Sequence, residues 1–125
     1  MTESYYRNVD ALLLLYDISS YYSFEYLVRW LEKYPSAKSG IPHLVLIGNK
    51  IDKSQRVVPR QIAERLADDY QMSYLETSAK TGQNVELAFL TTAQILHDKQ
   101  EKLEQSSIHS TIKLGQRQRA RDRCC

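Results

Sequence analysis

The fold of this chain is decided by residues 43–52, HLVLIGNKID. The first half, residues 43–47, is short, branched and free of alternating polar positions, which is typical of a strand buried on both faces of a parallel sheet. The second half, residues 48–52, is a polar turn. The same pairing recurs where a strand predicted at residues 74–77 leads into the turn ETSAK, residues 76–80. Because ligands of open α/β sheets lie at the carboxyl ends of the strands, we expect both turns at one site.

The first turn carries two side chains that suit a guanine base. Asp52 can accept two hydrogen bonds from the N1 and N2 donors of guanine, a donor pair that adenine does not offer on the corresponding edge. Asn49 can orient the turn and reach the other edge of the base. The Asn-Lys-x-Asp group alone also fits an ordinary surface turn. The second turn, one strand-helix unit downstream, favours the nucleotide site.

The remaining contacts to a base are assigned to both turns. The aliphatic stems of Lys50 and Lys80 can flank the ring faces, and backbone amides near Ser78 and Ala79 can donate to the guanine O6 atom. This recognition requires neither a metal nor acid/base chemistry, so no catalytic and no metal-ligating residue is predicted. The predicted site consists of Asn49, Lys50, Asp52, Ser78, Ala79 and Lys80.

Strands and helices alternate over the rest of the chain, which predicts an α/β fold with a parallel sheet. Residues 11–17 form the first strand, and residues 23–34 form an amphipathic helix. A second helix begins at Pro59, with an apolar stripe formed by Ile62, Ala63, Leu66, Ala67 and Tyr70. The last helix begins near Asn84 as N-cap. Its expected buried residues are Val85, Ala88, Phe89, Thr92, Ala93 and Leu96.

These motifs resemble the carboxyl-terminal part of a Rab-type small GTPase of the Ras superfamily. The resemblance rests on residues 5–7 (YYR), 11–17, 48–52, 76–80 and the final Cys124-Cys125. The segment ALLLLYD followed by ETSAKTGQNVELAF looks most like the secretory-vesicle Rabs. The resemblance implies the parallel-sheet P-loop NTPase (small GTPase) fold, truncated to its carboxyl-terminal strands and helices. It also implies guanine-nucleotide binding and regulation of intracellular vesicle trafficking and exocytosis.

Several parts of that family's nucleotide site are missing from this sequence. No Gly-x-x-x-x-Gly-Lys-Ser/Thr phosphate loop is present, and the family's Asp-x-x-Gly-Gln element would stand just upstream of Thr2. The magnesium-binding threonine of the first switch is also absent. GTP hydrolysis depends on these groups. We therefore expect GTP or GDP binding to be weak or absent, the Mg²⁺ ligands to be missing, and enzymatic activity to stay an open question.

A basic tail follows the predicted domain. Residues 1–105 are expected to form a partial G domain, and residues 106–125 a disordered tail. Five basic residues and one acidic residue give the last thirteen positions a charge of +4, which leaves −2 for the rest of a chain whose net charge is +2. This distribution argues against a basic nucleic-acid-binding domain.

Residue chemistry alone offers two explanations for the terminal Cys124 and Cys125, a disulfide and a zinc site, and both are unfavourable. A vicinal disulfide is strained, and a zinc site needs further ligands at usable spacing. The family resemblance implies instead that both cysteines carry geranylgeranyl groups. Two lipid chains beside arginines satisfy the requirement for stable anchoring on an anionic membrane. The expected location is the cytoplasmic face of vesicles or other intracellular membranes, and otherwise the cytosol.

The resemblance also implies partners: guanine nucleotide, prenylation machinery, chaperones of the GDP-dissociation-inhibitor type, Rab effectors and the membrane surface, with no nucleic acid. One alternative is a membrane-anchored interaction module that neither binds nor hydrolyses GTP. Another is a nucleic-acid binder that uses the arginine tail. Since the family's fold places a further strand beside residues 11–17, and that strand is absent here, we expect an apolar edge that promotes self-association.

Overall fold

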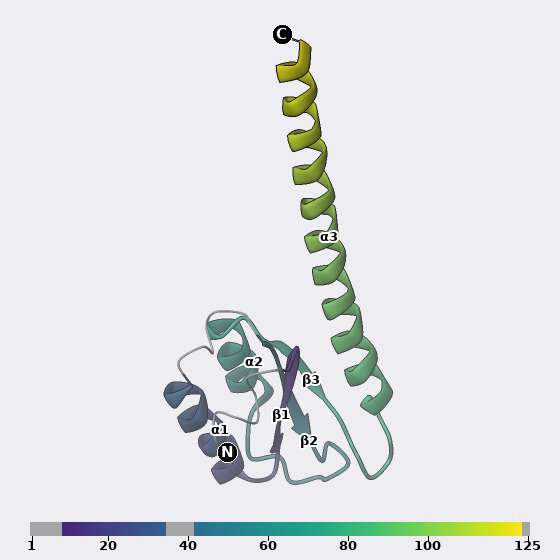
Figure 1. The fold of residues 1–125 in the computed structure, drawn as a ribbon. Helices are drawn as coiled ribbons and strands as arrows, with labels where there is room; N and C mark the ends of the chain where they lie inside the picture. The colour runs from purple at the N-terminus through teal and green to yellow at the C-terminus, as the bar shows by residue number, and fades with distance from the viewer. Residues whose placement is uncertain (1–8, 35–41, 124–125) are drawn as a thin grey trace. The chain divides into compact units, whose positions relative to one another are not determined.

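The computed structural model describes residues 9–34 and 42–123, with side chains as far as Ser107. The YYR motif and the terminal cysteines lie outside the described residues. The chain divides into two compact units, Met1–Thr92 and Ala93–Cys125, which we describe separately. The first unit contains the sheet, helices α1 (Tyr21–Lys33) and α2 (Arg60–Asp69), and the first turns of helix α3 (Val85–Arg123) (Figure 1).

The sheet has three parallel strands in the spatial order β1-β2-β3. Their bounds are β1 Ala11–Asp17, β2 His43–Asn49 and β3 Ser73–Glu76. The register places Asp17 beside Asn49, and Gly48 lies between Tyr16 and Glu76. All three carboxyl ends therefore meet at one edge of the sheet, and the predicted α/β class with a parallel sheet is confirmed.

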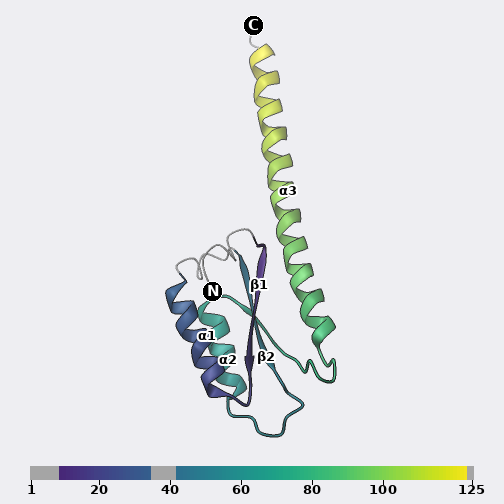
Figure 2. The same cartoon turned by 60° about the horizontal axis from the view of Figure 1, so that its bottom comes forward.

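Helices α1 (Tyr21–Lys33) and α2 (Arg60–Asp69) form the two crossovers and cover the same face of the sheet (Figures 1 and 2). Helix α1 begins two residues before the predicted start, because the Ser20 hydroxyl accepts a hydrogen bond of 3.3 Å from the Ser23 amide and caps the helix there. Helix α2 follows Pro59 as predicted. Its expected stripe is correct at Ala63 and Ala67, which are buried, and wrong at Ile62, which is 40% exposed.

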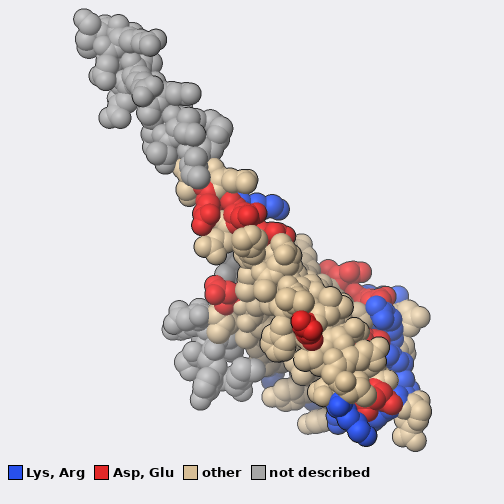
Figure 3. All heavy atoms as spheres, turned by 90° about the vertical axis from the view of Figure 1, so that its right-hand side faces the viewer, with Lys and Arg blue, Asp and Glu red and all other residues tan. Residues whose placement is uncertain are grey.

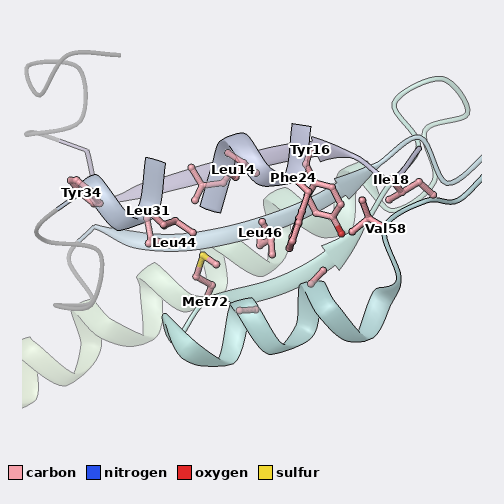
Figure 4. Close-up of a cluster of buried hydrophobic side chains, with 13 residues drawn as sticks. Leu14, Tyr16, Ile18, Phe24, Leu31, Tyr34, Leu44, Leu46, Val58 and Met72 are labelled. Atoms are coloured by element: carbon pink, nitrogen blue, oxygen red, sulfur yellow. The ribbon is translucent and has the colours of Figure 1, made fainter. Parts of the chain in front are cut away.

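The main core lies between the sheet and these two helices. Alternate residues of each strand point to this side, as the two-residue period of a strand requires. Figure 4 shows Tyr16 beside Phe24, and their rings meet edge to face with centroids 5.2 Å apart. The strand residues buried in this core are Leu14, Tyr16, Leu44 and Leu46. β2 is buried on both faces, which explains why its sequence is the continuous apolar run from which the fold was predicted.

The opposite face of the sheet has a smaller core. Val45 and Ile47 pack there with Ala88 from the first turns of α3. The expected burial of α3 is confirmed for Ala88 and Thr92, whereas Phe89 is 61% exposed. On the same face Leu15 of the outer strand β1 is 53% exposed. The first unit therefore buries only some of the apolar residues on this face.

Helix α3 extends over Val85–Arg123, so the backbone of residues 106–123 is helical where the sequence analysis expected disorder. The division between the two compact units falls within this helix, between Thr92 and Ala93. The helix continues because its later residues are mostly good helix formers without proline, even though they no longer show an apolar face. Within the described residues, no helix combines the length and apolarity needed to span a bilayer.

Candidate functional site

The two predicted turns meet at the carboxyl edge of the sheet. The side-chain oxygen of Asn49, at the end of β2, accepts hydrogen bonds from the Thr77 hydroxyl (3.1 Å) and the Ala79 amide (3.0 Å). Both donors belong to the turn after β3. These bonds fix which end of the Asn49 amide faces the second turn, so its NH₂ group is the end left to donate to a ligand.

Asp52 is oriented by the same turn. Its Oδ1 atom accepts a hydrogen bond of 2.7 Å from the hydroxyl of Ser78, which is fully buried. This bond is the main reason that the pKa of Asp52 lies below its ordinary value. The carboxylate is therefore ionised at neutral pH, and its other oxygen is positioned by a rigid neighbour. An ionised acceptor held in this way is what two N–H donors of a base require.

Backbone hydrogen bonds hold the two turns in register. The Thr77 amide donates to the Gly48 carbonyl (2.8 Å), and the Ile51 amide donates to the Thr77 carbonyl (3.2 Å). The ladder between β2 and β3 thus continues past the strand ends into the turns. The relative position of Asn49, Asp52 and Ser78 is consequently fixed by main-chain bonds as well as by side chains.

Lys50 makes a contact that the sequence analysis did not predict. Its backbone has a φ of 71°, and its Nζ atom forms an ion pair of 3.0 Å with Oδ2 of Asp17. Burial raises the pKa of Asp17, but hydrogen bonds from Ser19 and Lys50 outweigh that effect and lower it to about 2. The sequence analysis missed Asp17 as a site neighbour. Its place at the end of β1 was the available signal, because the register sets it beside Asn49.

The remaining predicted residues are Ala79 and Lys80, both exposed in the second turn. The amides proposed to reach the guanine O6 atom already have acceptors, because Ser78 donates to the Gln83 carbonyl (3.0 Å) and Ala79 donates to Asn49. A ligand oxygen would have to share the Ala79 hydrogen with the Asn49 side chain. The structure thus brings together Asn49, Asp52, Ser78 and Ala79, with Lys80 at the border.

The donor set suits a base but not a metal-phosphate group. Asn49 and Asp52 offer an amide donor and an ionised acceptor at the sheet edge, where neither is buried. Among the described residues no group of three or more His, Cys, Asp or Glu side chains could hold a metal ion. A magnesium nucleotide needs a phosphate loop with its own hydroxyl ligand, and the sequence holds no such loop. No step of phosphoryl transfer follows from these residues.

The sequence model of the Ras family matches residues 1–98. This chain belongs to the Ras family. Its relatives are Ras-related Rab proteins, so within that family the chain is Rab-like. It is 43% identical over 117 residues to the Ras-related protein Rab-26 of Bos taurus, covering 90% of this chain and 46% of that protein. Against Rab-37 of Mus musculus it is 38% identical over 126 residues, covering 100% of this chain and 56% of that protein.

A plant protein, RABE1e of Arabidopsis thaliana, is 40% identical to this Ras-family chain over 96 residues, which cover 75% of the chain and 44% of the plant protein. The chain thus spans about half the length of the curated relatives it matches. The family assignment agrees with the α/β fold of a small GTPase. It also explains why the two turns stand at neighbouring strand ends.

Proposed function

We propose that this Ras-family chain recognises the guanine base of GTP or GDP through Asn49 and Asp52. The observation that supports the proposal is the set of side-chain hydrogen bonds that joins these two residues to the turn of Thr77, Ser78 and Ala79. The set fixes an amide donor and a carboxylate acceptor relative to the same turn. The proposal covers the base-recognition half of a nucleotide site and no hydrolysis.

The affinity of such a half-site is expected to be low. Ligand efficiencies of about −0.3 kcal/mol per non-hydrogen atom, applied to the roughly 11 atoms of guanine, give about −3 kcal/mol. This corresponds to a dissociation constant of several millimolar. Phosphate contacts, which this sequence does not provide through a phosphate loop, would have to supply the rest of a physiological affinity.

A titration of the full chain with GMP to about 20 mM, followed by amide chemical shifts in NMR spectra, tests the proposal at that affinity range. We expect shifts concentrated at residues 49–52 and 77–80, and none with AMP. The matched control is Asp52→Asn, which keeps the shape of the side chain but presents an NH₂ group to the donors of the base. Equal responses to GMP and AMP, or an Asp52→Asn variant that still prefers GMP, would contradict base recognition.

The wider role proposed for the chain is regulation of vesicle traffic, including exocytosis, at the cytoplasmic face of intracellular membranes. It is supported by similarity to Ras-related Rab proteins. The proposed attachment is prenylation of Cys124 and Cys125, with prenylation machinery, GDP-dissociation-inhibitor-type chaperones and Rab effectors as partners. Incubation with geranylgeranyl diphosphate and the prenylating enzymes, followed by mass spectrometry, tests this. Two added groups are expected, and one in each single cysteine-to-serine variant.

A second candidate is an interaction module that has no nucleotide-dependent function. It is favoured by the exposed aromatic side chains Tyr21, Tyr22 and Tyr26 on α1, since aromatic residues are enriched in protein interfaces. This candidate predicts that a partner captured by the chain is retained equally in Asp52→Asn, whether or not GMP is present. A partner that is lost in Asp52→Asn would favour the nucleotide-dependent role.

A further inference from the structure

A chain of polar side chains crosses all three strands next to the candidate site. Tyr74 donates its hydroxyl proton to Oε2 of Glu76 at 2.6 Å. The hydroxyls of Tyr16 and Tyr74 lie 2.8 Å apart; since Tyr74 has no second proton, Tyr16 is the donor. Arg56 closes the chain with two bonds of 2.8 Å, one to each oxygen of Glu76.

The route of this chain is set by the middle strand. Tyr16 of β1 and Glu76 of β3 both lie in register with Gly48 of β2. A Cβ atom at Gly48 would come within 2.7 Å of the Tyr16 hydroxyl oxygen. The hydroxyl therefore uses space that only glycine leaves open, and Gly48 is required here by close approach rather than by a special backbone angle.

The carboxylate of Glu76 depends on these donors. Its side chain is 10% exposed, and a buried carboxylate without partners is strongly destabilising. Burial raises the pKa of Glu76, but the hydrogen bonds from Arg56 and Tyr74 outweigh burial, so the pKa lies below its ordinary value. The two-pronged geometry of a guanidinium with a carboxylate is also directional, so it fixes orientation as well as distance.

Arg56 connects this network to the loop that carries Asp52. The same guanidinium donates to the Val58 carbonyl (3.2 Å). The amides of Val57 and Val58 both donate to the Ile18 carbonyl, at 2.8 and 3.0 Å. At the other end of the loop, the Ile51 amide is bound to Thr77. Asp52 thus lies between two anchoring points, Ile51 at one end of the loop and residues 57–58 at the other. Arg56 is the side chain that connects the second anchoring point to β3.

We propose that Arg56 and Glu76 are positioning residues for Asp52: their paired hydrogen bonds clamp the loop of residues 50–58 onto β3 and so fix the carboxylate that reads the guanine base. This inference rests on the proposed function. Neither residue touches the base. The pair acts by holding the loop, while Ser78 holds the carboxylate itself.

The chain offers a matched control for the clamp. Arg60 also approaches Glu76, at 3.5 Å, and lies over the ring of Tyr74. It belongs to α2, outside the loop of residues 50–58. Arg60→Gln therefore removes one positive charge from the same carboxylate without releasing the loop, whereas Arg56→Gln removes the charge and the clamp.

The first arm of the test compares GMP with IMP, which lacks the N2 amino group, in NMR titrations of the full chain. A well-placed Asp52 should favour GMP by about tenfold, the effect of one charge-assisted hydrogen bond. We expect Arg56→Gln to reduce this preference to about twofold or less, and Arg60→Gln to retain it. Arg56→Lys, which keeps the charge but not the two-pronged guanidinium, should show a preference for GMP between those of the two glutamine variants. A merely structural role would weaken GMP and IMP binding equally, and an unchanged preference in Arg56→Gln overturns the proposal.

The second arm needs no ligand. Amide hydrogen exchange of Ile51, Val57 and Val58 should accelerate about tenfold in Arg56→Gln while Leu46 in β2 changes little. Arg60→Gln should leave all four unchanged. If the unmodified chain fails to discriminate GMP from AMP, the proposed function fails, and exchange still decides the clamp. Faster exchange confined to the loop supports it, whereas unchanged exchange, or acceleration shared by Leu46, overturns it.

Discussion

The hydroxyl of Ser78 donates a hydrogen bond of 2.7 Å to Oδ1 of Asp52. The donor is fully buried, whereas the acceptor is on the surface. Asp52 therefore differs from a flexible surface aspartate, because a hydrogen bond from a residue in the protein interior sets the orientation of its carboxylate. The affinity of the site for a base is therefore expected to depend on an interior side chain.

Ser78→Ala tests that dependence. The variant loses the donor that lowers the pKa of Asp52 and also the acceptor of the Thr81 amide, which lies 3.1 Å from the Ser78 hydroxyl. We expect the pKa of Asp52 to rise toward its ordinary value and the unfolding free energy to fall by about 1 kcal/mol. Carboxyl NMR titration and denaturant unfolding measure the two effects. A pKa that does not move would show that the hydrogen bond is unimportant in solution.

The pKa of Asp17, about 2 against an ordinary value of 3.8, predicts an acid dependence of stability. Because the folded value is the lower one, the contribution is complete above the ordinary value and is lost as pH falls from about 4 through about 2. Ser19→Ala removes a 2.6 Å bond to this carboxylate. It should raise the pKa of Asp17 toward its ordinary value, although the Ser19 amide bond remains. Lys50→Met, which removes the ion pair, should raise it as well. Carboxyl NMR titration of both variants, with Glu25→Gln as the control on α1, measures both shifts.

Gly48→Ala should destabilise the fold by about 1 to 3 kcal/mol, since the added methyl group overpacks the space beneath Tyr16. Tyr16→Phe removes the nearest atom, so the glycine substitution should cost less in that background. A double-mutant cycle by chemical denaturation measures the coupling. Additive effects would place the strain elsewhere, for example at the Ile18 methyl carbon, 3.1 Å from the added Cβ.

We expect the edge of the outer strand β1 to promote self-association. Within the described residues β1 pairs with β2 alone, and Leu15 and Phe89 are exposed on the face opposite α1 and α2. Figure 3 views the molecule from this side and shows mostly uncharged atoms around the start of α3. Unpaired apolar edges attract further chains. Sedimentation velocity should show association that Leu15→Lys reduces. Tyr22→Lys, an exposed change on α1, should not reduce it.

The sequence predicted the sheet and the meeting of the two turns because these depend on short-range patterns. β2 is apolar on both faces, and the two polar turns follow strands, so their meeting follows from parallel topology alone. The ion pair between Lys50 and Asp17 was not predicted, because it joins the ends of β1 and β2 and needs their register. The same holds for the pair of Arg56 and Glu76, because tertiary contacts bring the loop of residues 50–58 against β3.

Errors in burial have a different cause. Apolar spacing identifies the side of a helix that can be buried, not the surface available to bury it, and Phe89 therefore remains exposed. In the later part of α3 the helix continues although the apolar spacing has ended. The apolar pattern ends near Gln100, but backbone hydrogen bonds and helix propensity continue the helix without a packed face.

The strand-helix-strand unit of β2, α2 and β3 has a consequence for the order of folding. Every predicted base contact, from Asn49 to Lys80, lies at the end of β2 or in the turns that follow β2 and β3, ahead of Val85 where α3 begins. The bonds that join the two turns span 26 to 30 residues, so the turns meet only once this unit has closed. During synthesis from the amino terminus, all of these residues are made before α3 begins.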